Sequence, residues 1–320
     1  MIRVASFNVR NLNSAVEKDS RKSRDIKRMA DLVKDCDIVV LQEVIAENMI
    51  NVSSNVGAER SLTRELGLHW EGKWVDSQTH SKKNPYLGED RRGEGYAFLW
   101  NTQRVELIKE NDRVIYPRRY GDYMLAPDTE QIRLRRDPGY GRFKLKTRPV
   151  EIRVINVHII SNKPDQANMT VDVDGGAITM RKLEFDVLAG RIFKKIDDDR
   201  LSERNNAVYT LIMGDFNLNL QGSELTTATI PAVSCYDNFG RPCVLGTTQM
   251  KTIQKERTTI NKERDGYANN YDHCTYNTRS EHVIGNCYRI QAIDDDTPEA
   301  FKEYYETVSD HLPIVVELNC

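Results

Sequence analysis

Short apolar runs of strand length recur along the chain, and two helical patterns lie between them. The runs are rich in β-branched and aromatic residues, which is typical of strands buried in a sheet. We expect the two runs around Thr102–Arg104 to form a hairpin, and the run before Gly214 to end in a tight turn. The runs that we interpret as strands are Ile2–Val9, Asp37–Val44, Tyr96–Asn101, Val105–Lys109, Val150–Ile160, Tyr209–Met213 and Leu312–Leu318.

The two helical patterns predict helices outside these strands. Ile26, Met29, Ala30 and Val33 recur at the spacing of one apolar helical stripe, and Ile178–Ile196 is the second pattern. Many strands with few helices indicate layered sheets covered by helices. Because no repeat, low-complexity run or Pro/Gly-rich linker divides the sequence, we expect one domain over residues 1–320, with basic insertions near 113–147 and 246–270.

Composition indicates a globular chain without a marked global charge. Of 320 residues, 39% are hydrophobic and 29% charged, which is enough apolar material for a core. The net charge of −2 does not point to a polyanionic partner by itself. No run of 18 apolar residues predicts a membrane span, and no signal-peptide pattern opens the chain. A cytoplasmic monomer is therefore favoured, and a secreted protein whose signal was removed stays open. No protein partner can be inferred.

The six cysteines do not form a metal or redox motif. None belongs to a Cys-x-x-Cys pair, so neither a zinc ribbon nor thioredoxin-type chemistry is supported. Cys235 and Cys243 flank a polar loop and can pair in an oxidising compartment, but free thiols are favoured.

Polar residues able to bind metal or phosphate stand at the ends of many predicted strands. Rigid scaffolds present chemistry at such positions. Each residue alone has a structural explanation, as a turn residue or a buried core histidine. Together they are difficult to ascribe to chance. The set is Asn8, Glu43, Glu94, His158, Asp215, Asn217, Asp272, Asp310 and His311.

The order of these short motifs resembles the endonuclease/exonuclease/phosphatase superfamily, and within it the deoxyribonuclease I-like enzymes. The resemblance implies an α/β (α+β) fold, a four-layer α/β/β/α sandwich of two packed mixed β-sheets with outer helices. It places the active site in a cleft at one edge. The matching stretches are Val4–Arg10, Asp37–Val44, Gly93–Leu99, Arg148–Pro149, Asn156–His158, Gly214–Asn217, Tyr271–Asp272 and Ser309–Pro313.

The resemblance also implies a metal site and a phosphate site. Glu43 looks like the principal metal ligand, with Asn8 and Asp310 beside it. Mg²⁺ is the expected ion, with Mn²⁺ as a substitute and Ca²⁺ as an alternative, because hard cations prefer oxygen ligands. Arg148 resembles an arginine that contacts the reacting phosphate.

The catalytic histidines implied by the resemblance are His158 and His311. Glu94 resembles the acid that orients His158, and Asp272 the acid that orients His311. A carboxylate behind an imidazole fixes its tautomer and raises its pKa. We expect His311 as the base and His158 as the group that stabilises or protonates the leaving side, with the reverse assignment left open.

Asp215 and Asn217 complete the implied set as the pair that positions water and phosphate. His158 separates this chain from apurinic-site endonucleases, which resemble it elsewhere but usually carry a tyrosine there. The cysteines do not match the disulfide positions of deoxyribonuclease I, and its structural calcium sites are not evident.

Charge is concentrated between Arg113 and Arg148. This stretch holds ten basic and four acidic residues, a local excess of six, with tyrosines interleaved. We expect Arg133, Arg135 and Arg136 to hold phosphates of a nucleic acid beside the reacting one. The alternative is a basic loop that is simply solvated.

The function predicted from the sequence is a metal-dependent phosphodiesterase, with double-stranded DNA as substrate and a low sequence specificity. The alternative is a phosphatase or phosphodiesterase acting on a lipid, an inositol phosphate or RNA. A membrane-acting enzyme would carry an exposed apolar loop, and the long loops are polar and basic. A non-catalytic module would be expected to lack one of Glu43, His158, Asp215 or His311, and all are present.

Overall fold

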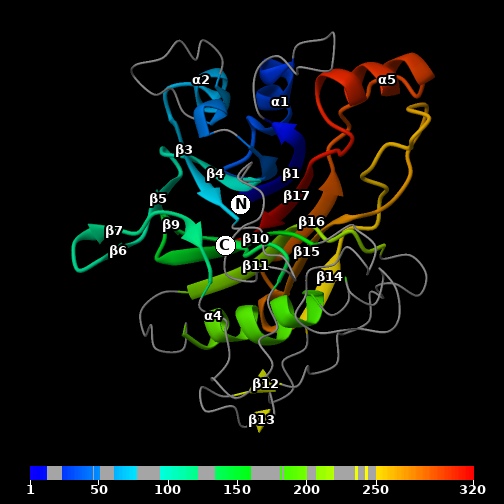
Figure 1. The fold of residues 1–320 in the computed structure, drawn as a ribbon. Helices are drawn as coiled ribbons and strands as arrows, with labels where there is room; N and C mark the ends of the chain where they lie inside the picture. Colours follow the sequence, from blue (N-terminus) through cyan, green and yellow to red (C-terminus); the bar gives the residue numbers. More distant parts are fainter. Residues whose placement is uncertain are drawn as a thin grey trace.

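Two β-sheets pack face to face, with helices on both outer faces, in the computed structural model of the protein (Figure 1). Among the residues described, no helix is long and apolar enough to cross a membrane. The structure describes residues 1–12, 24–45, 47–50, 61–77, 94–121, 134–159, 181, 184–199, 207–219, 235–236, 242–243 and 250–320.

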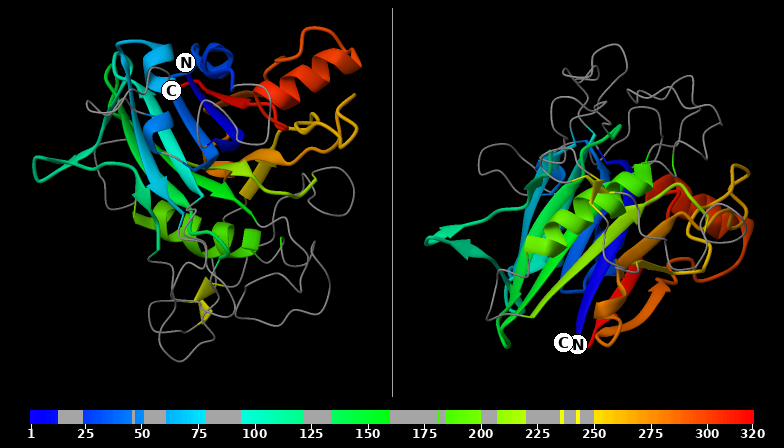
Figure 2. Two further views of the ribbon diagram at one scale, coloured as in Figure 1. Left: turned by 45° about the horizontal axis from the view of Figure 1, so that its top comes forward. Right: turned by 90° about the horizontal axis from the view of Figure 1, so that it is seen from below.

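The first sheet has six strands in the order β16-β17-β1-β2-β4-β3. Only β1 and β2 pair in parallel, and the other neighbours are antiparallel. The pairing of β1 with β17 brings Ile2 opposite Leu318, so the two chain termini lie close together (Figure 2). The strands are β1 (Ile2–Leu12), β2 (Ile38–Val44), β3 (Trp70–Asp76), β4 (Gly95–Asn101), β16 (Ile284–Arg289) and β17 (Ile314–Leu318).

The second sheet has the order β14-β15-β11-β10-β9-β5, and β8 also pairs with β9. Here β10 and β11 form the parallel pair. Its strands are β5 (Val105–Leu107), β8 (Arg118–Arg119), β9 (Gly139–Leu145), β10 (Val150–His158), β11 (Ala207–Asp215), β14 (Met250–Ile253) and β15 (Asp272–Asn277). Two small hairpins lie outside both sheets, β6 (Lys109–Glu110) with β7 (Arg113–Val114), and β12 (Cys235–Tyr236) with β13 (Pro242–Cys243).

The helices cover the outer faces of the two sheets. In Figure 1, α1 (Ile26–Val33), α2 (Leu62–Leu66) and α5 (Pro298–Thr307) lie beyond the first sheet, and α4 (Lys194–Asp199) lies beyond the second. A π-helical segment, η3 (Leu188–Phe193), leads directly into α4. The short 3₁₀ segments are η1 (Glu47–Met49) and η5 (Thr278–Ser280).

Alternation along the strands sorts the apolar side chains into three layers. Val4 and Ile38 point between the sheets, where they meet Ile152 and Val154 of β10. Alternate residues of the first sheet pack instead against α1 and α5, and those of the second against η3 and α4. The predicted four-layer α/β/β/α sandwich with two mixed sheets is confirmed.

The helix predicted from the Ile26–Val33 stripe is confirmed as α1, with those four apolar residues buried. Helix is also present in the described part of 178–196. The predicted hairpin is wrong. β4 pairs with β2 and β3 in the first sheet, whereas β5 pairs with β9 in the second. Both edges of β4 are already occupied by partners, so the turn at Thr102–Arg104 carries the chain across to the other sheet.

Hydrogen bonds also join the two sheets near the ends of their parallel strands. Nε2 of Gln42 on β2 donates to Oδ1 of Asn156 on β10 at 2.6 Å, and Nδ2 of Asn156 donates to the Leu41 carbonyl at 2.9 Å. Both amides are completely buried. Because such bonds are directional, they fix the alignment of the sheets better than apolar packing does.

The cysteines Cys36, Cys274, Cys287 and Cys320 are free thiols. Cys235 lies directly opposite Cys243 in the β12–β13 pair. The side chains of these two residues lie outside the described part of the structure, so the clip between them stays a prediction.

Candidate active site

The parallel strand pairs of both sheets end at the same place, and polar side chains gather there. At the end of β2, Glu43 has a φ of 59°, in the left-handed region that non-glycine residues rarely adopt. The pairing of β2 with both neighbours shifts register at this point. Oε2 of Glu43 accepts the backbone N–H of Asn11 at 3.0 Å. The irregular strand end thus turns the carboxylate toward the second sheet.

Asn8 connects the two sheets at the centre of the cluster. Its Nδ2 donates to Oε1 of Glu43 at 3.0 Å and to Oδ2 of Asp215 at 3.1 Å. Its Oδ1 accepts the backbone N–H of Arg10 at 3.0 Å, which orients the amide. Asn8 therefore holds two carboxylates from different sheets close together.

Gly214 allows β11 to deliver Asp215 to this point. Its φ is 149°, and a Cβ built there would lie 1.9 Å from the carbonyl oxygen of Val157 on the neighbouring strand β10. Only glycine permits this approach. The register then places Asp215 beside His158 on β10 and opposite Asp272 on β15.

His158 is linked through Glu94 to Arg136. Its Nδ1 lies 2.5 Å from Oε1 of Glu94, and the guanidinium of Arg136 donates to Oε2 of Glu94 at 2.8 Å. Burial raises the pKa of Glu94, but the charges of Arg136 and His158 outweigh burial and hold that pKa at about 2. Burial and Arg136 lower the pKa of His158, but Glu94 and Asp215 leave it above its usual value.

His311 forms the second imidazole–carboxylate pair. Its Nδ1 lies 2.8 Å from Oδ2 of Asp272, and its backbone N–H donates to Oγ of Ser309 at 3.1 Å. Burial lowers the pKa of His311, but the charges of Asp272 and Asp215 raise it well above its ordinary value.

Asp215 lies between the two imidazoles. Its Oδ2 is 3.6 Å from Nε2 of His158 and 3.6 Å from Nε2 of His311. Burial raises the pKa of Asp215, and the two histidines offset only part of that rise. Its Oδ1 accepts the backbone N–H of Asn217 at 2.9 Å, which closes a tight turn at a φ of 49° for Asn217.

Seven of the residues predicted from the sequence are thus linked by short contacts at one place. They are Asn8, Glu43, Glu94, His158, Asp215, Asp272 and His311. Asn217 adjoins them but turns its amide toward the Ile159 carbonyl, to which Nδ2 donates at 3.0 Å. Asp310 lies 4.0 Å from Nε of Arg10, with 34% of its side chain exposed.

The predicted arginines need correction. Arg148 precedes β10, whereas His158 ends it, and a strand of this length spans about 25 Å at ~3.3 Å per residue. Arg148 therefore lies outside the site. The arginine that reaches the cluster is Arg136, which pairs with Glu94 and has a side chain only 15% exposed. Its predicted contact with a neighbouring phosphate stays a prediction, as does that of Arg135, and Arg133 lies outside the described residues.

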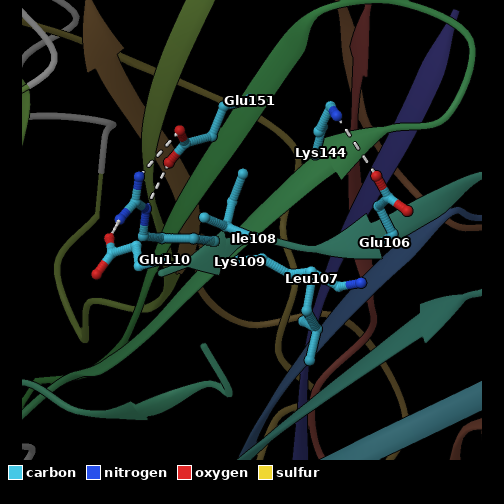
Figure 3. A pocket seen from close by; sticks show the side chains of 8 residues that line it. Glu106, Leu107, Ile108, Lys109, Glu110, Lys144 and Glu151 are labelled. Atoms are coloured by element: carbon cyan, nitrogen blue, oxygen red, sulfur yellow. Dashed lines mark hydrogen bonds and ion pairs between the residues drawn. The ribbon is translucent and has the colours of Figure 1, made fainter. Parts of the chain in front are cut away.

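A separate cavity of about 360 Å³ lies on the second sheet (Figure 3). Arg142 reaches both Glu151 and Glu110, and Lys144 lies 3.6 Å from Glu106. Acidic and basic side chains thus pair with each other around this cavity, which is not lined by either histidine of the cluster.

The sequence of the chain matches the model of the Endonuclease/Exonuclease/phosphatase family over residues 5–311. The chain belongs to this family. Members of the family are hydrolases that act on phosphate esters, and they generally depend on a divalent metal. No curated protein matches the chain significantly.

Solved structures with the same fold are distant in sequence. A family member from Bacteroides thetaiotaomicron is 18% identical, with a TM-score of 0.52, and covers 99% of this chain and 94% of its own. A mannosyl-6-phosphatase from the same organism is 17% identical, with a TM-score of 0.51 and 99% of each chain covered. Truncated TDP2 from Caenorhabditis elegans is 13% identical, with a TM-score of 0.51 and 99% and 96% covered. At these identities the likeness shows the fold alone.

The donor set of the cluster suits a hard divalent cation. Glu43 and Asp215 each offer carboxylate oxygens, and Asn8 holds both within 3.1 Å of one nitrogen. Across the described residues, no three His, Cys, Asp or Glu side chains converge as a complete metal site. Two carboxylates held together in this way fit a divalent cation that prefers oxygen ligands.

Proposed function

We propose that this chain is a divalent-metal-dependent phosphodiesterase that cuts double-stranded DNA with low sequence specificity. The observation that carries the proposal is the pair of imidazole–carboxylate units facing Asp215, beside Glu43. Such an arrangement serves proton transfer on both sides of an anionic phosphate. The family relationship supports hydrolysis of a phosphate ester, and DNA as the substrate is part of our proposal.

Glu43 is the residue that we assign to the metal, with Asn8 and Asp310 beside it. A bound divalent cation would neutralise charge on the phosphate. We expect Mg²⁺ to serve, Mn²⁺ to substitute and Ca²⁺ to be the alternative. In its present hydrogen bonds Asn8 offers its amide nitrogen to the carboxylates, so its first contribution is to hold Glu43 and Asp215 together.

Hydrolysis requires water to attack phosphorus, the bond to the leaving oxygen to break, and a proton to reach that oxygen. The raised pKa values of His158 and His311 favour their protonated forms, which donate to phosphate oxygens and to the leaving oxygen. Asp215 is then the better acceptor for the water proton, because burial raises its pKa. His311 as the base, which is expected from the sequence, stays the alternative.

Positive charge near the cluster supports DNA as the substrate. Arg136 brings the basic 113–148 stretch to the Glu94–His158 pair. We propose that Arg133 and Arg135 hold the phosphates that follow the reacting one. Replacing both by Ala should raise KM for long DNA and weaken its salt dependence, while hydrolysis of a small diester is unchanged.

One observation bears on the lipid alternative. Leu68 is 99% exposed and Tyr116 56% exposed, and both line a groove of about 600 Å³ with Trp70 and Trp100. The sequence predicts no exposed apolar loop, whereas this groove has exposed apolar side chains. Trp100, however, stands near the far end of β4 from Glu94, so a membrane bound there would not present its headgroups to the histidines.

A substrate panel tests the proposal. Supercoiled plasmid, single-stranded RNA, a phosphomonoester, and phosphoinositide or sphingomyelin vesicles are each incubated with the protein and Mg²⁺. We expect plasmid to be nicked and then linearised at many positions. Hydrolysis confined to RNA or to sphingomyelin would overturn DNA as the substrate and leave a phosphodiesterase. Phosphate release confined to the phosphomonoester or the phosphoinositide would overturn the phosphodiesterase as well.

A further inference from the structure

The segment Gln254–Asn270 overlaps the second basic insertion noted in the sequence, and a short stretch in its first half is buried against the active site. Lys255–Arg257 is exposed, but Thr258–Ile260 is buried. Thr259 forms a β-bridge with His311, and the N–H of Ile260 donates to the Asp310 carbonyl at 2.9 Å. The insertion is therefore attached to the loop that carries His311.

Thr258 makes the contacts that join this loop to the strand of Asp272. Its Oγ1 accepts two consecutive backbone N–H groups, from Tyr271 at 3.1 Å and from Asp272 at 3.2 Å. Its carbonyl accepts the N–H of Leu312, the residue after His311, at 2.8 Å. One completely buried residue thus binds the backbone at both members of the His311–Asp272 pair.

The side-chain link between His311 and Asp272 is a single hydrogen bond. Oδ2 of Asp272 holds Nδ1 of His311, while its buried Oδ1 has no hydrogen-bond partner among the described residues. The orientation of the imidazole relative to Asp215 therefore depends on how the two backbones are held. Small displacements of a catalytic group cost rate without loss of the fold.

We propose that Thr258 is a positioning residue for the reaction, and that it acts through the His311–Asp272 pair. The inference rests on the proposed function, since it assigns His311 to the same phosphodiesterase site. Thr258 aligns the imidazole toward Asp215 and touches neither substrate nor metal.

The test compares three variants on a small diester and on plasmid. Thr258→Val removes the hydroxyl at nearly constant shape, Thr258→Ser keeps it, and Thr259→Val is the matched control. The Thr259 hydroxyl makes two hydrogen bonds, both to Asn269 within the same segment. We expect Thr258→Val to lower kcat roughly tenfold with little change in KM, Thr258→Ser to restore most of it, and Thr259→Val to stay near wild type.

Double variants separate positioning from a general loss of stability. In an Asp272→Asn background, Thr258→Val should add little, whereas in a Glu94→Gln background it should keep its full effect. Equal effects in both backgrounds, or the same loss in Thr259→Val, would overturn the inference. A wild-type protein inactive on both substrates would instead count against the proposed function. Thermal unfolding of each variant confirms that the folded enzyme is measured.

Discussion

Nε2 of His158 and Nε2 of His311 lie at the same distance, 3.6 Å, from one oxygen, Oδ2 of Asp215. The two imidazoles are held from behind by Glu94 and Asp272. The cluster thus has two similar halves around one carboxylate. This symmetry is the basis for assigning proton donors to both sides of a phosphate and a proton acceptor between them.

Loss of either imidazole should impair catalysis. His158→Ala and His311→Ala should each lower kcat by roughly 10²-fold or more, and Glu94→Gln and Asp272→Asn by less. Each histidine and its acid act as a unit, so the double variants within a pair should fall far short of the product of the single effects. Steady-state kinetics on a small diester provides the measurement. Simple additivity in both pairs would refute the assignments.

Arg136 and Arg148, both predicted from the sequence to contact phosphates, should behave differently. Arg136→Gln removes the partner of Glu94, whose side chain is 17% exposed, and should lower kcat by roughly 10²-fold, the range for a disturbed acid–base group. Arg148→Gln changes an exposed residue at the other end of β10 and should leave kcat/KM near wild type. A large loss in Arg148→Gln would show that the substrate reaches farther along the sheet than the structure indicates.

Gly214 should tolerate no side chain. In Gly214→Ala, the added Cβ meets the Val157 carbonyl at a backbone angle that L-residues rarely adopt. We expect a loss of at least about 4 kcal/mol of stability, in the range of the most damaging single substitutions. Chemical denaturation measures it. A variant within about 1 kcal/mol of wild type would contradict the geometry at this turn.

Stability should fall as pH drops below neutrality, in part because of His273. Burial lowers the pKa of His273 to about 4, despite hydrogen bonds to backbone carbonyls that raise it. The unfolded chain takes up this proton below about 6.5, whereas the folded chain resists until about 4. The contribution of the neutral imidazole is therefore full above pH 6.5 and lost between 6.5 and 4, by up to about 3 kcal/mol.

Urea unfolding between pH 4 and 7 checks this dependence. His273→Gln should flatten the slope in that window, while the exposed His282→Gln should leave it unchanged. An unaltered slope in His273→Gln would mean that other groups carry the pH dependence.

The sequence predicts seven strands and most of the cluster, because apolar runs and polar strand ends are local patterns. The strands β3, β8, β9, β14, β15 and β16 are not among the predicted runs. Residues such as Asn8, His158 and Asp215 stand at the ends of apolar strands, and the ends of parallel neighbours meet at one edge of a sheet. The pattern does not tell which sheet a strand joins. For that reason the pattern predicts a hairpin of β4 and β5, although the two strands belong to different sheets.

Other features depend on contacts that no local pattern records. The sequence assigns Arg148 to the reacting phosphate, and only the tertiary pairing with Glu94 reveals that Arg136 is the arginine at the cluster. No sequence pattern marks Thr258, because its contacts with the backbone beside Asp272 and His311 form only in the folded chain. The left-handed backbone at Glu43 likewise arises from the register shift at the end of β2.

Plasmid nicking as a function of Mg²⁺ concentration shows whether hydrolysis depends on a metal held at Glu43. Glu43→Gln keeps the size of the side chain and removes its charge, so the fold should persist. The wild-type protein should lose activity in excess chelator and regain it with Mg²⁺ or Mn²⁺. Glu43→Gln should be at least roughly 10²-fold slower at every Mg²⁺ concentration. Undiminished nicking in excess chelator, or wild-type rates for Glu43→Gln, would contradict a metal-dependent reaction at Glu43.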